Sequence, residues 1–193
     1  MLPQNPIALK EWAVVCRALA LGRQSLLLRK GGIHEQGGSF QLAHREFWLL
    51  PTFEHQRRDA LADDAVDLWL PTLADQPPSG TLRIGLYAVV DDEFTLTDAT
   101  SLAGLAGLQV LSQNIVFDRY HYRVAGLFVL PIRVFALKQP FALDEKPSFA
   151  GCRSWVDLET PLSTEGLAPV FDEKTFQQQM RAIRRELKPT GWA

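Results

Sequence analysis

The sequence predicts an α+β fold in a single domain spanning residues 1–193. Three observations predict it. Short runs with the alternation of strands recur along the chain, whereas apolar side chains at helical spacing occur near both ends. The apolar fraction of 47% and the charged fraction of 22% are those of an ordinary globular protein. A length of 193 residues favours one domain with a substantial core.

The first half of the chain contains two predicted helices and four predicted strands. Asn5 and Pro6 are typical of a helix start, and apolar side chains at helical spacing continue this helix to Gly22, a typical end. A second, acidic amphipathic helix is expected over residues 59–70. Pro51 is expected to end one of the strands. The strands are expected at residues 25–29, 46–50, 81–90 and 94–96, the last two joined by a hairpin turn.

The second half is also predicted to contain both helices and strands. A short helix is expected over residues 100–108, capped by Thr97 or Asp98. Residues 115–121 and 127–136 have the composition of strands. An amphipathic helix is expected over residues 172–187. Its apolar stripe comprises Phe176, Met180, Ile183 and Leu187.

The composition excludes several classes of protein. Cys16 and Cys152 lie far apart and form no CxxC motif, so neither a zinc site nor a disulfide framework is indicated. No apolar run reaches the roughly 18 residues of a membrane span. The first residues lack the pattern of a signal peptide, so we expect a cytoplasmic protein that does not contact membranes.

Charge is unevenly distributed along the chain. Residues 1–58 carry eight Lys and Arg against four Asp and Glu, whereas residues 59–100 carry one against nine. A basic first segment suits an anionic ligand, and it is equally typical of a solvated surface. The sequence pI of about 6.1 argues against a dedicated high-affinity nucleic-acid binder but allows a local basic patch.

Two apolar runs, residues 26–28 and 47–51, end abruptly in polar, turn-forming residues. Strands that end in this way often deliver polar groups to one rim of a pocket. A glycine pair after the first run can offer backbone N–H groups to an anion. The sequence therefore predicts one anion-facing rim. Its expected ligand-binding residues are Arg29, Lys30, Gly31, Gly32, Thr52, His55 and Gln56.

Residues 118–123 form a second basic candidate. In a strand, Arg119, His121 and Arg123 share one face, opposite Tyr120 and Tyr122. The basic row suits phosphates, and the aromatic rings can stack on bases. We include Arg119 and Arg123 among the expected ligand-binding residues. A solvent-facing edge strand is the alternative explanation of the same pattern.

Cys152 is a candidate nucleophile because it lies between a glycine and Arg153, and a nearby cation lowers the pKa of a thiol. The favoured alternative is a tight loop in which Trp155 packs inward. Arg153 and Trp155 are nevertheless expected at the ligand site.

The histidines support only weak catalytic interpretations. His55 is a candidate general base, with Glu54 or a metal ion as its partner. His44, Glu54 and His55 lack the spacing of metal ligands, and neither GxxxxGK[ST] nor GxGxxG occurs. We therefore expect no metal site and no cofactor.

Four segments resemble an uncharacterised bacterial family, domain-of-unknown-function family 1802. They are residues 8–13 (ALKEWA), 27–33 (LLRKGGI), 47–56 (FWLLPTFEHQ) and 151–155 (GCRSW). The resemblance covers most of the chain, from Ala8 to about Leu158. It implies no activity.

A weaker resemblance links residues 22–29 to the opening of the ASCH/PUA-like superfamily. Gly22 and Arg29 match that pattern, whereas Gln24 and Leu27 stand where ASCH proteins have Lys and Glu. Residues 133–141 resemble the strand and proline that close such barrels. The resemblance implies a small mixed or antiparallel β-barrel, at about residues 8–158, with an N-terminal helix, short connecting helices and a C-terminal helix. It also implies RNA or modified bases as ligands.

Several functions remain open. The first is a binding module that holds nucleic acid or a nucleotide-like anion against the predicted rim. The second is a hydrolase or nuclease that acts on a nucleic-acid-like substrate, with His55 as general base. The third is a protein–protein interaction module. We favour binding because carboxylates are sparse around the predicted rim.

Overall fold

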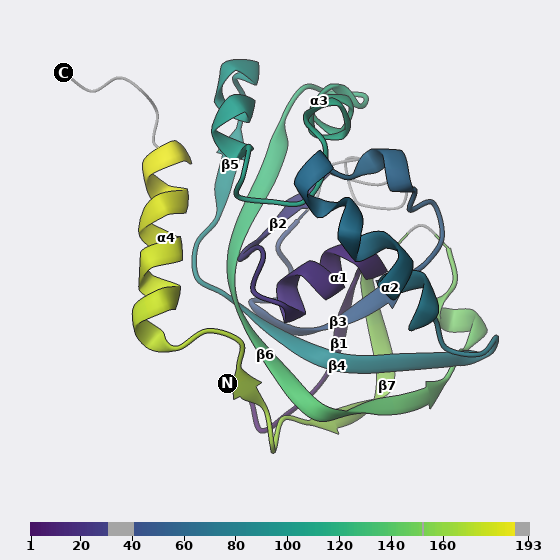
Figure 1. Cartoon of the computed structure of the whole chain (residues 1–193). Helices are drawn as coiled ribbons and strands as arrows, with labels where there is room; N and C mark the ends of the chain where they lie inside the picture. Colours follow the sequence, from purple (N-terminus) through teal and green to yellow (C-terminus); the bar gives the residue numbers. More distant parts are fainter. Residues whose placement is uncertain (31–40, 152, 188–193) are drawn as a thin grey trace.

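A strongly curved mixed sheet forms the centre of the molecule (Figure 1). The computed structural model describes residues 1–30, 41–151 and 153–187. The hydrogen-bonded order of the strands is β2-β6-β4-β3-β1-β7, and β5 and β8 each pair with β6. Only β1 and β3 are parallel among the described pairs. The strands are β1 (Gln4–Trp12), β2 (Leu26–Arg29), β3 (Glu46–Thr52), β4 (Thr81–Val90), β5 (Phe94–Leu96), β6 (Leu127–Asp144), β7 (Trp155–Ser163) and β8 (Ala168–Pro169).

The sheet curls without closing. In the described part of the chain no backbone pairing joins β7 to β2, so the predicted barrel is an open, mixed sheet. Its curvature comes from β6, which pairs with β2 and β5 near its start and with β4 along the rest of its length. The β4–β6 register shifts between Ile84 and Leu86, where an irregularity bends both strands. Gly85 lies at this bend.

Four α-helices accompany the sheet in the described part of the chain, and the predicted α+β class is confirmed. Figure 1 shows α1 in the hollow of the curved sheet and α4 on the opposite side of β6. No helix in the described part of the chain is long and apolar enough to span a bilayer. The helices are α1 (Ala13–Ala20), α2 (Trp69–Ala74), α3 (Gln113–His121) and α4 (Glu173–Leu187), with short 3₁₀ segments at 58–60, 63–68, 99–105 and 147–149.

Two predicted elements are of the wrong type. Residues 4–12 form a strand, so the first helix begins at Ala13 rather than at Pro6. The missing N–H of Pro6 falls where the register of β1 with β7 shifts, between Asn5 and Ile7. Residues 113–121 form a helix instead of a strand. The side chain of Ser112 accepts a hydrogen bond from Ile115 N and so caps the start of α3.

Other elements differ in extent or pairing. β3 continues through Pro51 to Thr52, because β4 pairs with β3 only as far as Leu49 and needs no N–H from Pro51. β5 pairs with β6 rather than forming a hairpin with β4. The predicted helix at 59–70 consists of two 3₁₀ segments followed by α2. β6 extends past Ala136 to Asp144, and β7 was not predicted.

Two apolar cores lie on opposite faces of β1 and β3. The larger one contains α1, α4 and the side of β1 that carries Leu9, and the smaller one is centred on Trp48 and Tyr87. Phe176, Met180, Ile183 and Leu187 of α4 are buried, as predicted.

A buried polar network crosses the smaller core. Asn5 Nδ2 donates to Glu46 O (2.8 Å) and to Tyr87 Oη (3.0 Å), and Tyr87 Oη donates to Glu46 Oε2 (3.0 Å). Burial raises the pKa of Tyr87 to about 12, and the Glu46 carboxylate acts in the same direction. This network fixes the start of β1 against β3 and β4.

Candidate functional site

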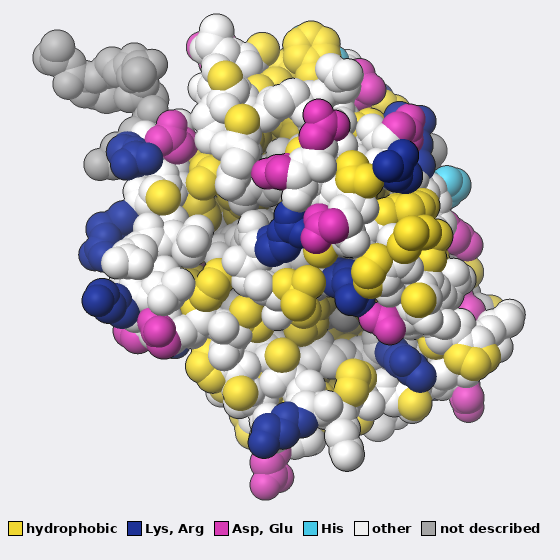
Figure 2. Space-filling model, in the orientation of Figure 1, with side chains coloured by type: hydrophobic (Ala, Val, Ile, Leu, Met, Phe, Trp, Pro, Cys, Tyr) yellow, Lys and Arg dark blue, Asp and Glu magenta, His cyan; other side chains and the backbone are white. Residues whose placement is uncertain are grey.

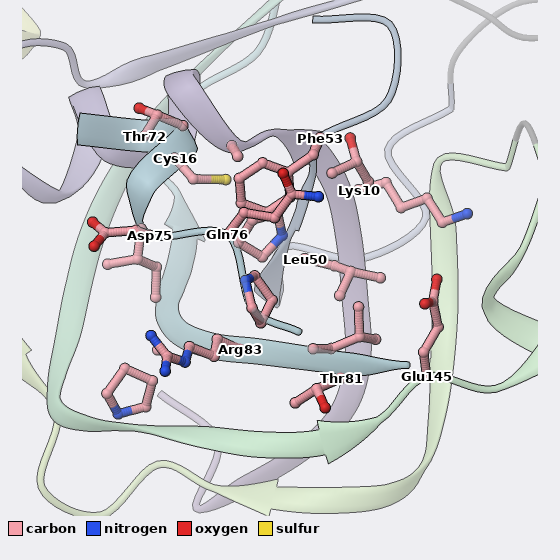
Figure 3. Close-up of a pocket in the computed structure, with 18 of the residues that line it drawn as sticks. Lys10, Cys16, Leu50, Phe53, Thr72, Asp75, Gln76, Thr81, Arg83 and Glu145 are labelled. Carbon is pink, nitrogen blue, oxygen red and sulfur yellow. The ribbon is translucent and has the colours of Figure 1, made fainter. Parts of the chain in front are cut away.

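A cleft of about 700 Å³ opens beneath α1, between residues 72–80 and the curved parts of β4 and β6 (Figure 3). This volume is within the range of small-molecule sites. Its apolar lining includes Leu50, Phe53, Leu86 and Leu137. Gly85, at the bend of β4, and Pro140 of β6 both line the cleft, and a Cβ added at Gly85 would lie 3.0 Å from the Cβ and Cγ atoms of Pro140.

The cleft is electrostatically uneven. Figure 3 shows Arg83 on the side of Asp75, whereas Lys10 and Glu145 lie at the opposite end. Asp75 forms an ion pair with Arg17 of α1. The Arg83 end therefore carries two guanidinium groups and one carboxylate. At the other end Lys10 Nζ donates to Gly151 O (2.8 Å), and this end carries one cation and one carboxylate.

Cys16 lies in the cleft wall on the inner face of α1. Burial raises the pKa of its thiol well above the usual value, and the nearby Glu11 carboxylate raises it further. A protonated thiol is a weak nucleophile, so Cys16 contributes a small apolar surface to the cleft rather than reactivity.

The Glu11 cluster, formed by Glu11, Trp12, Arg29 and Arg119, lies beside this cleft, outside its lining. Glu11 is 4% exposed. Its Oε2 accepts from Arg29 Nη1 (3.1 Å), and its Oε1 accepts from Trp12 N (2.8 Å). Arg29 Nη1 also donates to Lys10 O (3.0 Å). The cluster therefore ties the end of β2 to the end of β1 across the opening of the sheet.

Arg119 enters the cluster from α3. Its guanidinium lies 4.7 Å from the centre of a ring of Trp12 and donates to Leu28 O (3.3 Å). Burial lowers the pKa of Arg119, an effect that Glu11 opposes and Arg29 reinforces.

Thr52 and Gln56 lie at the same end of the sheet. Thr52 Oγ1 donates to Glu11 O (3.3 Å), and Gln56 Oε1 accepts from Val14 N (3.2 Å), which caps the first turn of α1. Thr52 also lines the cleft. The structure thus brings Arg29, Arg119, Thr52 and Gln56 together around β1.

Lys30 donates to backbone oxygens of the α3 region. Its Nζ contacts Tyr120 O (3.0 Å), Gly126 O (2.6 Å) and Val124 O. Burial lowers the pKa of Lys30. The ammonium group satisfies carbonyls at the C-terminal end of α3, where the helix dipole favours a cation.

The other predicted site residues are dispersed. Glu54 lines the cleft, whereas His55 is exposed outside its lining, with φ at 61°. Arg123 and Arg153 are exposed. Trp155 is partly buried, with its Nε1 donating to Gln41 O (3.1 Å). Gly31, Gly32 and Cys152 lie outside the described residues.

Sequence reasoning found Thr52 and Glu54 in the cleft but missed Lys10, Arg17 and Arg83. Arg83 alternates with Leu82 and Ile84, and this pattern indicates which face of β4 it occupies. The pattern does not show that α1 and residues 72–80 cover that face.

No group of three His, Cys, Asp or Glu side chains suited to a metal ion occurs among residues 1–30, 41–151 and 153–187. On the face drawn in Figure 2, cationic and anionic side chains alternate instead of forming one large patch of a single sign. On this face, charges of one sign therefore gather only in groups of a few residues.

The pattern of a family described as "Domain of unknown function (DUF1802)" matches residues 8–182. Similar solved structures include ASCH from Zymomonas mobilis, at 13% identity and a TM-score of 0.42, covering 91% of this chain and 93% of that chain. Two mutants of the same protein give 13% and 12% identity, each with a TM-score of 0.43, covering 93% and 91% of this chain and 98% and 96% of theirs. At these scores no residue role passes from those proteins to this chain. A comparison with curated proteins finds no match.

Proposed function

Because this chain belongs to the DUF1802 family, whose description assigns no activity, we propose a function from its own residues. The protein is a binding module whose cleft takes a nucleotide, either free or as a unit of nucleic acid. The phosphate lies at the Arg83 end, and the base lies against the apolar lining.

The charge distribution of the cleft carries this proposal. Asp75 is already paired with Arg17, so the carboxylate at this end does not neutralise Arg83. Arg83 has no ion pair with any described residue. A guanidinium with its donors available is well suited to a phosphate.

The remaining lining suits the base. Phe53 and Leu50 offer apolar surface, while Gln76 and Ser79 add hydrogen-bonding groups at the wall. A flat heterocycle with polar edges matches a site that combines apolar surface with a few polar side chains. The cleft volume of about 700 Å³ accommodates a molecule of this size.

The proposal is tested by calorimetry with the four common ribonucleoside 5′-monophosphates at low salt. We expect at least one to bind, more weakly as salt rises, and Arg83→Ala to weaken it about tenfold through loss of a charge-assisted contact. Arg181→Ala is the matched control, because Arg181 is exposed on α4, outside the cleft lining. Failure of all four nucleotides to bind, or unchanged binding by Arg83→Ala, would contradict the proposal.

A further inference from the structure

A second feature, remote from the cleft lining, combines exposed aromatic rings with cations. The α3 tip comprises Phe117, His121, Tyr122, Arg123 and Val124. Phe117 is 52% exposed, Tyr122 48% and Val124 79%. Large apolar side chains that cluster at the surface indicate a binding partner more often than single exposed ones do.

The rings of the α3 tip take part in two pairwise contacts. The ring centroids of Phe117 and His121 are 4.2 Å apart. The guanidinium of Arg123 lies over the ring of Tyr122, at 5.2 Å from its centroid. Arg123 has φ at 61°, a conformation that non-glycine residues rarely adopt. Arg123 thus lies in the turn that follows the end of α3.

Lys30 holds the α3 tip in place. Its contacts with Tyr120 O, Val124 O and Gly126 O fix the turn that carries Tyr122 and Arg123. The Lys30 ammonium also adds positive charge at the C-terminal end of α3, where free carbonyls would otherwise repel an anion. The α3 tip is therefore preorganised, and the charge beneath it is compatible with phosphate.

The local charges favour nucleic acid over an apolar protein surface. Arg123 lies on the tip, and the Lys30 ammonium contacts the turn that carries it, whereas Asp118 is the one acidic residue of α3. Exposed rings interleaved with cations suit a strand whose bases stack and whose phosphates are anionic. A duplex buries the faces of its bases and offers no such stacking.

We propose that the α3 tip binds single-stranded nucleic acid, with bases stacked on Phe117 and Tyr122 and a phosphate contacting Arg123. This inference extends the proposed function, because it specifies a polymer rather than a free nucleotide as the ligand.

Fluorescence anisotropy with labelled twelve-nucleotide single strands of RNA and DNA, at low salt, tests the proposal. We expect the double variant Phe117→Ala/Tyr122→Ala to weaken binding at least tenfold. Arg123→Asn, which tolerates the positive φ, is expected to weaken binding less and to reduce its salt dependence. Leu70→Ala removes an apolar side chain on α2 that is more exposed than either ring, and it is expected to leave binding unchanged.

The two proposals fail separately. The inference alone is overturned by two results found together. Monophosphate binding is lost in Arg83→Ala and unaffected by the tip variants, and oligonucleotide binding is also unaffected by the tip variants. Oligonucleotide binding that depends on the tip, without any monophosphate in the cleft, overturns the cleft proposal alone. Equal affinity for a duplex of the same length, or a tip that binds protein instead, also overturns the inference.

Discussion

Lys30 and Arg83 show how similar side chains serve different purposes at the scale of a residue. Lys30 follows an apolar strand and precedes two glycines, a pattern that predicts a group facing a ligand. In the structure its ammonium donates to the backbone oxygens of Tyr120, Val124 and Gly126, which lie at least 90 positions further along the chain. Nothing local in the sequence identifies those acceptors. Arg83, which faces the cleft, lies in an ordinary alternating strand and carries no such signal.

Tyr87 supports a prediction of pH dependence. Its pKa is raised from 10.0 to about 12, so the phenol stays neutral in the folded chain after it begins to ionise in the unfolded one. This contribution to stability is fully present below pH 10 and is lost as the pH rises towards 12. Between pH 10 and pH 12, we expect the free energy of unfolding of the wild type to fall by about 1–2 kcal/mol more than that of Tyr87→Phe.

Urea unfolding at a series of alkaline pH values measures this difference, with each protein compared with itself at neutral pH. If the free energies of unfolding of the wild type and Tyr87→Phe fall in parallel as the pH rises, ionisation of the buried phenol does not cause the alkaline loss of stability.

At the scale of elements, the correct predictions are those in which local pattern and tertiary burial agree. In α4, the stripe of Phe176, Met180, Ile183 and Leu187 is both helical in spacing and buried. The strands around residues 26, 46, 81 and 127 were found for the same reason. The family assignment, which rests on four segments, is also confirmed.

The two elements of wrong type show where local pattern fails. β1 has strand neighbours on both sides, β3 and β7, and this pairing overrides the helix-start signal of Asn5 and Pro6. In α3, the β-branched and aromatic residues suggested a strand. The buried positions Ile115, Val116 and Tyr120 fit one face of a helix, and Ser112 is a typical cap. The helix thus had a signal, but alternating basic residues obscured it.

Gly85 supports a prediction about the bend in β4. An added Cβ would lie 3.0 Å from two ring atoms of Pro140, and a proline ring cannot rotate away. We expect Gly85→Ala to lower the free energy of unfolding by about 1 kcal/mol and to narrow the cleft. Chemical denaturation measures the loss, which should shrink in a Pro140→Gly background. Equal loss in both backgrounds would exclude this contact as the cause.

For the whole molecule, the Glu11 cluster takes the place of the strand pairing that would close a barrel. Arg29 of β2 reaches Glu11 and Lys10 O of β1, although β6, β4 and β3 separate these strands in the sheet. Arg29 is ion-paired with the buried Glu11 carboxylate, and the charge of Glu11 also acts on the buried guanidinium of Arg119, so removal of Glu11 leaves both without that counter-charge.

We therefore expect Glu11→Ala to lower the free energy of unfolding by about 3 kcal/mol, and Glu11→Gln to lower it less, because the amide can still accept from Trp12 N. Glu54→Ala is the control, since Glu54 is exposed. Urea denaturation at neutral pH gives the comparison. A loss for Glu11→Ala no larger than that of the control would mean that the cluster does not hold the sheet together.

The position of β1 between β3 and β7 has a consequence for synthesis on the ribosome. β1 is translated before the other described elements, yet Gln4 pairs with Ser163, and Thr164 Oγ1 donates to Leu2 O. The β7 edge of β1 therefore stays unpaired until residues 155–163 have been translated. Until β7 emerges, the nascent chain exposes an unpaired strand edge, which is a template for pairing with another chain and hence for aggregation.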